Sequence, residues 1–282
     1  MRNPFISLLF CISLYVAFQA HAHAATVAHW RFEGTDVTFF EDSSGNGHDL
    51  GFDDNTTVES ATPYTLPTTG AGSAFLDPLP QSGLLNTGAA NFTTSGVDGY
   101  LRAPDSSAWT TNTFTIEAMV NLTTVGALQS IAGQLSTIEA AKRTLLFHVN
   151  SGNKLAIIIN NDTISSSLQL SGSVDYYVGV AVDLTAPENE RLTFYLQDLT
   201  NGGALQSQTL DTDSTNILDN ISPFSIGSTS SPSSRFNGLI DEVRFSDTAL
   251  EASELLIAPE PARAMFLCLG LMLASLRRKR SR

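Results

Sequence analysis

The chain has 282 residues, of which 28 are Asp or Glu and 15 are Lys or Arg, so its formal net charge is −13. Seven of the basic residues but only one acidic residue lie outside residues 25–258, which leaves that region with 27 acidic and 8 basic groups. Such a surface repels phosphate groups, so the composition argues against nucleic-acid binding. A plainer interpretation of the acidity is that it keeps the protein soluble.

The first 24 residues have the pattern of a secretory signal peptide. Arg2 precedes an apolar run over residues 5–18, and Ala22 and Ala24 supply the small residues of a cleavage site. A buried helix is the alternative, but this stretch opens the chain and is followed at once by a strand-like segment. We therefore expect an exported protein that is cleaved after Ala24.

Both cysteines, Cys11 and Cys268, lie outside the region 25–258, so the body of the protein has no disulfide. The body alternates in the manner of β-strands. In residues 114–122 apolar side chains occupy every second position, and residues 192–197 repeat this pattern. Many such strands at short spacing favour an all-β fold, a two-sheet antiparallel jelly-roll sandwich.

Residues 55–96 are rich in Pro, Gly and Thr, and we expect long surface loops there with one or two short strands. Near the end of the body, Thr248 and Glu251 form a capping-box pattern that predicts a short helix over residues 248–256. In "GLIDEVRF", alternation puts Asp241 on the same strand face as its apolar neighbours. A lone carboxylate buried in this way costs several kcal/mol unless it is protonated, hydrogen-bonded or bound to a cation.

The sequence shows no common hydrolase motif. There is no closely spaced Glu-x-Asp-x-x-Glu run and no G-x-S-x-G elbow. The histidines of the body, His29, His48 and His148, lack zinc-site spacing, and a structural role is the expected one for His29. Trp109 and Tyr64 have rings that stack on sugars, but Trp109 is expected in the core.

Two terminal segments carry a resemblance to a known family. "VAHWRFEGTDVTFFEDSSGNGHDLG" near the start and "FNGLIDEVRFSDTALEASEL" near the end together resemble the two ends of a laminin-G-like domain of the concanavalin A-like jelly-roll superfamily. "DGYLRAPDSSAWTTNTFTIEAMVNL", "YYVGVAVDL" and "PFSIGS" fit the same family in order. The resemblance implies a sandwich in which the first and last strands meet.

The resemblance also implies a structural Ca²⁺ site where the two ends meet. Its ligands would be Asp42, the carbonyls near Asn46 and Gly47, and Asp241, with Glu33 as a weaker candidate. Carboxylate and carbonyl oxygens are the ligands that Ca²⁺ takes, and the ion would staple the termini of a body without disulfides. The alternative is that Asp42 only makes an Asx turn and Asp241 bonds to backbone amides.

The chain ends in Pro259-Glu260-Pro261, an apolar run over residues 264–276 and a basic cluster. This order resembles the Pro-Glu-Pro sorting signal (PEP-CTERM) of Gram-negative bacteria, which implies recognition and cleavage by an exosortase. A helix over the apolar run would cover roughly 20 Å of a hydrocarbon layer that is about 30 Å thick. An ordinary single-span anchor is the alternative. The expected organisation is therefore signal peptide 1–24, jelly-roll domain 25–258 and sorting tail 259–282.

Taken together, these features predict an exported, non-enzymatic protein that binds glycan or protein. It would be anchored in the membrane by its tail, or released to the cell surface or extracellular matrix if the tail is cut. The expected partners are an exosortase-type enzyme and an extracellular polysaccharide or surface protein. Two alternatives remain, a carbohydrate-active hydrolase or lyase and a purely structural matrix component. The missing acidic pair argues against the first, and self-assembly without saturable ligand binding would mark the second.

Overall fold

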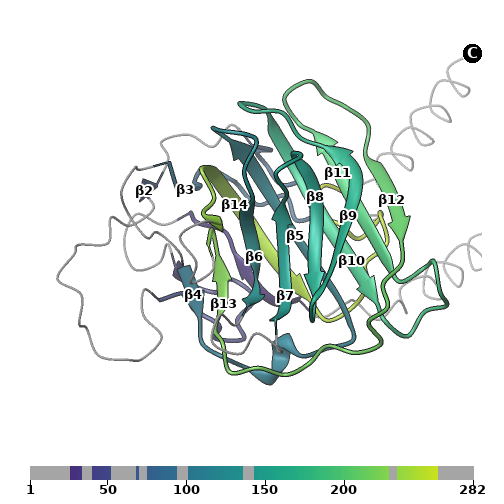
Figure 1. Cartoon of the computed structure of the whole chain (residues 1–282). Coiled ribbons are helices and arrows are strands. Elements are labelled where there is room, and N and C mark those ends of the chain that lie inside the picture. The colour runs from purple at the N-terminus through teal and green to yellow at the C-terminus, as the bar shows by residue number, and fades with distance from the viewer. Residues whose placement is uncertain are drawn as a thin grey trace, which may run out of the picture.

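The computed structural model describes residues 26–33, 40–51, 68–69, 75–93, 101–135, 143–228 and 234–259. These residues form two antiparallel sheets packed face to face, the predicted jelly-roll sandwich (Figure 1). No helix in this described part is long and apolar enough to cross a membrane. The predicted signal peptide and the tail after Pro259 lie outside the described residues and stay predictions, and so does any stacking by Tyr64.

The larger sheet has eight strands and carries both ends of the body. They are β1 (Thr26–Trp30), β2 (Thr68–Thr69), β3 (Ala90–Asn91), β5 (Thr113–Leu122), β10 (Asp175–Asp183), β11 (Leu192–Asp198), β12 (Gln206–Leu210) and β14 (Gly238–Ser246). Their order is β12-β11-β10-β5-β14-β3-β2, and β1 also pairs with β14. Trp30 faces Val243 in that pair, so the first and last strands do meet.

The smaller sheet has six strands in the order β4-β13-β6-β7-β8-β9. They are β4 (Leu101–Ala103), β6 (Gln129–Leu135), β7 (Arg143–Val149), β8 (Lys154–Ile159), β9 (Asp162–Gln169) and β13 (Phe224–Ile226). A single turn of 3₁₀ helix, η2 (Ser107–Trp109), precedes β5. Apart from β2 and β3 no strand is described in residues 55–96, which agrees with the expected loops.

The main core lies between the two sheets, and the predicted alternation of β5 is confirmed there. The core cluster holds apolar side chains of β7 and β8 together with one face of β5, namely Phe114, Ile116, Ala118, Val120 and Leu122. Aromatic rings fill one part of this core. Trp30 stacks on Phe224 at 5.5 Å between ring centroids, and Trp109 lies 4.8 Å from the same ring. Trp109 is fully buried, so it is a core residue as predicted.

The outer face of the larger sheet is covered as well, which the sequence pattern of β5 did not indicate. The segment 75–89 packs Phe75, Leu79 and Ala89 on Met119 of β5. The segment 247–258 packs Leu250 and other apolar residues on tyrosines of β10 and β11. We call these two stretches the covering segments. They turn a strand face that would be half exposed into a second buried layer.

The helix predicted over residues 248–256 is wrong, because the chain forms successive turns there. Thr248 Oγ1 donates to the carboxylate of the preceding residue, Asp247 (3.2 Å). The hydroxyl of Thr115 on β5 instead donates to the Thr248 carbonyl (2.7 Å) and accepts from the Leu250 amide (2.8 Å). In the predicted helix the Thr248 carbonyl would accept the first intrahelical bond and the Leu250 amide would bond to the capping side chain. Both groups are bonded to the sheet instead, and these long-range bonds override the local capping signal.

Candidate functional site

A bulge in β14 decides which side chains enter the candidate site. Asp241 pairs with Met119 and Arg244 pairs with Glu117, so one extra residue is inserted on β14. Glu242 occupies the bulge with a φ of 50°, in the left-handed region that non-glycine residues rarely adopt. As a result Asp241, Glu242 and Arg244 all lie on the outer face of the sheet, beneath the covering segments.

This bulge corrects the simple alternation that the sequence predicted for β14. Ile240, Val243 and Phe245 belong to the core between the sheets, whereas Leu239 packs with the outer cluster. Asp241 is therefore carried away from the main core rather than into it. It is still fully buried, because the covering segment 75–89 lies over it.

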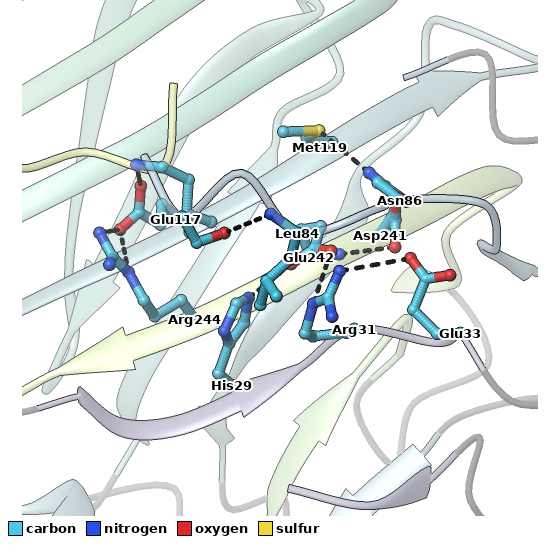
Figure 2. Close-up of polar contacts among 12 residues, drawn as sticks. His29, Arg31, Glu33, Leu84, Asn86, Glu117, Met119, Asp241, Glu242 and Arg244 are labelled. Atoms are coloured by element: carbon cyan, nitrogen blue, oxygen red, sulfur yellow. Dashed lines mark hydrogen bonds and ion pairs between the residues drawn. The ribbon is translucent and has the colours of Figure 1, made fainter. Parts of the chain in front are cut away.

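The N-terminal segment contributes a histidine and an arginine to this buried layer. Apolar residues of β1 point into the core, which leaves His29 and Arg31 for the outer face. Arg31 Nε donates to Glu242 Oε1 (3.1 Å), and His29 Nε2 lies 2.6 Å from Glu242 Oε2 (Figure 2). The Glu242 side chain has no exposed area. The ends of the body are thus joined by a buried ionic contact, and the structure gives His29 a structural contact.

A second ionic contact joins Arg244 of β14 to Glu117 of β5. Arg244 Nε donates to Glu117 Oε1 (2.6 Å), and its Nη2 contacts the same oxygen. The guanidinium also donates to Gln81 Oε1 (2.7 Å) and to the Glu254 carbonyl (2.9 Å). Gln81 and Glu254 belong to the two covering segments, so one arginine fastens both of them to the sheet.

Glu117 completes this network with its second oxygen. Glu117 Oε2 accepts from the Tyr177 hydroxyl (2.8 Å) and from the Leu256 amide (2.9 Å). Burial, together with the charge of Glu117, raises the pKa of Tyr177 well above its ordinary value, so the phenol keeps the proton that it donates. Burial and nearby acidic charges raise the pKa of Tyr195 to about 12, and its hydroxyl donates to the Leu250 carbonyl (3.2 Å).

Asp241 lacks such a partner. Its Oδ1 accepts from the Glu242 amide (2.8 Å), but its Oδ2 and the neighbouring Asn86 Oδ1 are buried without a hydrogen bond. Asn86 turns its nitrogen to Met119 Sδ at 3.9 Å (Figure 2). The opposite orientation of this amide would place its NH₂ on Asp241, a contact that would lower the pKa of the carboxyl. Burial and then the Glu242 charge outweigh it, so the pKa of Asp241 lies well above its ordinary value.

Asp42 is in the opposite situation. Its Oδ1 accepts from the amides of His29 (2.9 Å) and Ser44 (2.9 Å), and its Oδ2 accepts from Ser44 Oγ (2.8 Å) and the His48 amide (3.1 Å). A carboxylate has about four lone-pair sites, and all are used. Burial acts to raise the pKa of Asp42, but these bonds outweigh it and the pKa is lowered. Gly47 has a φ of 79°, which a tight turn requires.

The remaining predicted ligands also hold chain segments together. Asn46 Nδ2 donates to the carbonyls of Thr26 (2.9 Å) and Val27 (3.0 Å), which ties the turn to β1. Both oxygens of Glu33 accept from the Thr87 amide at 3.0 Å, and Glu33 Oε2 also accepts from the Thr87 hydroxyl (2.6 Å). Glu33 therefore fixes the covering segment 75–89 near the end of β1.

The oxygens that suit a hard cation are consequently those around Asp241. Asp241 Oδ2 and Asn86 Oδ1 are unpaired, and the charges of Glu242 and Glu33 add to the negative potential there. Asp42 has no acceptor site left, and no contact between described residues joins it to Asp241. No group of three or more His, Cys, Asp or Glu side chains in the described part is arranged to hold a metal. Calcium binding stays a prediction, and Asn86 is a potential ligand that the sequence analysis missed.

Comparisons with known proteins agree with this architecture. Residues 94–256 match the family model of the concanavalin A-like lectin/glucanases superfamily. Domain 4 of AbnA, an extracellular GH43 arabinanase from Geobacillus stearothermophilus solved with arabinotriose, is 17% identical with a TM-score of 0.55, over 83% of this chain and 98% of that domain. No curated protein sequence matches the chain.

Two further structures are similar at lower scores. A Trypanosoma rangeli sialidase, solved as a covalent intermediate with 2,3-difluorosialic acid, is 12% identical with a TM-score of 0.49, over 83% of this chain and 32% of that one. The CBM40 of a Ruminococcus gnavus IT-sialidase, bound to α2,3-sialyllactose, is 18% identical with a TM-score of 0.42, over 53% of this chain and 83% of that one. At these identities the likeness concerns the fold alone.

Proposed function

Because the chain belongs to the concanavalin A-like lectin/glucanases superfamily, we propose that it is an exported, non-enzymatic protein that binds carbohydrate through its jelly-roll body. The observation that carries the proposal is the likeness to domain 4 of the arabinanase, which this chain covers over 98% of its length and which was solved with arabinotriose. The inference from that domain to this one is an analogy of fold.

The environment of the buried carboxylates favours binding over glycoside hydrolysis. Hydrolases of this kind place two carboxyl groups on either side of the scissile bond, where substrate can reach them. Glu117, Asp241 and Glu242 are fully buried, and the first and third are held by arginines. These groups fasten the covering segments and the terminal strands, so they do not face a polysaccharide chain.

The charge of the body indicates the class of carbohydrate. With 27 acidic and 8 basic residues between positions 25 and 258, the surface repels uronic acids and sulfated sugars. We therefore expect a neutral oligosaccharide or polysaccharide as ligand. The site of action would be the cell surface or the extracellular matrix. The support is the predicted signal peptide and the predicted sorting signal in the tail, which an exosortase would recognise.

We also propose a structural Ca²⁺ held by Asp241 Oδ2 and Asn86 Oδ1. The support is that both oxygens are buried without a donor when the Asn86 amide has the orientation of the structure, and that the charges of Glu242 and Glu33 act on Asp241. A bound cation would balance the Asp241 charge and join β14 to the covering segment 75–89. This assignment keeps Asp241 from the sequence-based set and replaces Asp42 by Asn86.

A glycan array probed with residues 25–258 tests the proposed function. The expected result is saturable binding to neutral glycans, with anionic glycans bound more weakly. Reducing-sugar release from the same panel, measured in parallel, would instead establish a carbohydrate-active enzyme. Concentration-dependent self-assembly without saturable glycan binding would favour the structural matrix role.

A further inference from the structure

Two adjacent leucines project from the covering segment 75–89. Leu84 is 49% exposed and Leu85 is 68% exposed, whereas Leu79 in the same segment is fully buried. Single exposed apolar residues are ordinary on protein surfaces, but a neighbouring pair of large ones on a fixed backbone is less so. We refer to Leu84 and Leu85 as the leucine pair.

The backbone beneath the leucine pair is held firmly. The Leu79 amide donates to the Leu84 carbonyl (2.9 Å), and the Gly83 amide donates to the Leu79 carbonyl (2.7 Å). Arg31, which also bonds the buried Glu242, donates to the Leu85 carbonyl (2.5 Å). Side chains displayed from such a base lose little backbone entropy when they bind a partner.

The same loop lies where the described chain ends. The Gln81 amide donates to the Leu256 carbonyl (3.2 Å), and Gln81 Nε2 donates to the Glu254 carbonyl (2.5 Å). The apolar run 264–276 begins five residues after Pro259. Five residues of extended chain reach at most about 17 Å, so an inserted tail would bring this part of the surface close to a bilayer.

We propose that the leucine pair contacts the lipid bilayer into which the tail inserts. The inference rests on the membrane anchoring predicted for the tail. A run of 13 apolar residues is shorter than the roughly 20 that span a bilayer, and stable attachment by weak anchors takes two signals. The leucine pair provides the second signal from the folded body.

The surroundings of the leucine pair favour a lipid over a protein. Stable protein interfaces bury about 1,200 Å² or more in total, which two side chains cannot supply. Glu251 is exposed and Glu254 is partly exposed in the adjacent covering segment, so an electrostatic attraction to anionic lipids is unfavourable here. The contact is therefore apolar and should be insensitive to salt.

A fluorescent probe tests the contact in the full chain. In a Cys11→Ser, Cys268→Ser background, Leu85→Cys is labelled with an environment-sensitive dye and reconstituted into zwitterionic phosphatidylcholine vesicles. We expect a blue shift and protection from iodide quenching at this position. Ile221→Cys is the matched control, because Ile221 is 81% exposed and lies in the loop anchored by Gln134 on the smaller sheet. Its label should remain as quenchable as in solution.

Substitution gives the second measurement. Leu84→Ser with Leu85→Ser should lower the vesicle partition coefficient, measured by flotation after dilution, by about tenfold or more, because burying a leucine is worth at least that factor. The melting temperature should not change. The control variant, Leu218→Ser with Ile221→Ser, should leave flotation unchanged.

Two outcomes would overturn the inference. If the chain floats but the label at position 85 stays quenchable and the serine substitutions at positions 84 and 85 have no effect, the leucine pair does not contact the bilayer, although the tail still anchors the chain. If the unmodified chain does not float, anchoring itself fails, and the inference with it.

Discussion

Two carboxylates that the family resemblance places in one metal site, Asp42 and Asp241, have opposite surroundings. Asp42 lies in a turn and accepts four hydrogen bonds, whereas Asp241 lies on a strand and leaves one buried oxygen unpaired. The pKa of Asp42 is lowered and that of Asp241 is raised. The residue type is the same, so the difference comes from the surroundings. Four hydrogen-bond donors outweigh burial at Asp42, whereas burial and the charge of Glu242 dominate at Asp241.

The comparison shows how geometry decides which carboxylate is free for a ligand. A tight turn directs successive amides at one side chain, so Asp42 is satisfied largely by residues near it in sequence. A strand directs its amides sideways into the sheet, and a carboxylate on its face depends on partners from distant segments. Glu117 has such partners, with Arg244, Tyr177 and Leu256. Asp241 does not.

The largest effect is expected at the buried ion pair of Glu117 and Arg244, in which the carboxylate has all its partners. Arg244→Met should cost about 3–5 kcal/mol of unfolding free energy, because it leaves Glu117 buried without its cation and releases both covering segments. Urea unfolding measures the loss. The double variant Glu117→Leu with Arg244→Met should recover much of it, since no charge is then left unpaired. Equal instability of the two variants would contradict this account.

The next largest effect is expected at Asp42, which accepts four hydrogen bonds (the Asp42 clamp). Asp42→Ala should cost about 3 kcal/mol, because four donors lose a charged acceptor. Since the pKa of Asp42 is lowered in the folded state, its contribution is present above the ordinary carboxyl pKa of about 4 and disappears as the pH falls through the lower folded value. The gap in stability between wild type and variant should therefore narrow below about pH 4. If the difference in unfolding free energy between wild type and Asp42→Ala widens below about pH 4, this interpretation is wrong.

Asp241 should show the opposite pH dependence. Its folded pKa is raised, so the stability from the protonated form is present below about pH 4 and is lost as the pH rises through the folded pKa. In EDTA, wild type should therefore lose stability relative to Asp241→Asn between acidic and neutral pH. Calcium at 100 times its dissociation constant should restore about 2.7 kcal/mol to wild type and nothing to the variant. Calorimetry with and without EDTA measures this calcium response. A response that survives in Asp241→Asn but not in Asp42→Asn would mean that the ion is bound at the turn that contains Asp42.

These contrasts also show what the sequence could predict. Alternation identified the core face of β5 and the sandwich, because burial between two sheets imposes a period of two. The paired terminal motifs indicated that β1 and β14 meet, and they do. The inserted residue in β14 gave no such signal, because a bulge depends on register with a partner strand and breaks the period without changing composition.

Contacts between residues that are distant in the sequence could not be predicted from it either. Asn86 lies in a stretch rich in Pro and Gly where nothing marks one amide as the neighbour of Asp241. The turns at residues 248–256 replaced a predicted helix because Thr115, distant in sequence, bonds to their backbone. The alternative that Asp42 makes an Asx turn was available from sequence, and its donors His29 and His48 required the fold.

The smallest effect isolates one donor of the Asp42 clamp. Ser44→Ala removes the hydroxyl that donates to Asp42 Oδ2 (2.8 Å) but keeps the Ser44 amide bond, so it should cost about 1 kcal/mol. The same hydroxyl also lies 3.1 Å from the Val27 carbonyl, which offers a competing explanation. A double-mutant cycle with Asp42→Asn separates the two. If the hydroxyl acts through Asp42, the cost of Ser44→Ala should fall towards zero in the Asp42→Asn background. A cost that is unchanged there would mean that Ser44 stabilises β1 directly, and Asp42 would then have a lone pair available for a cation after all.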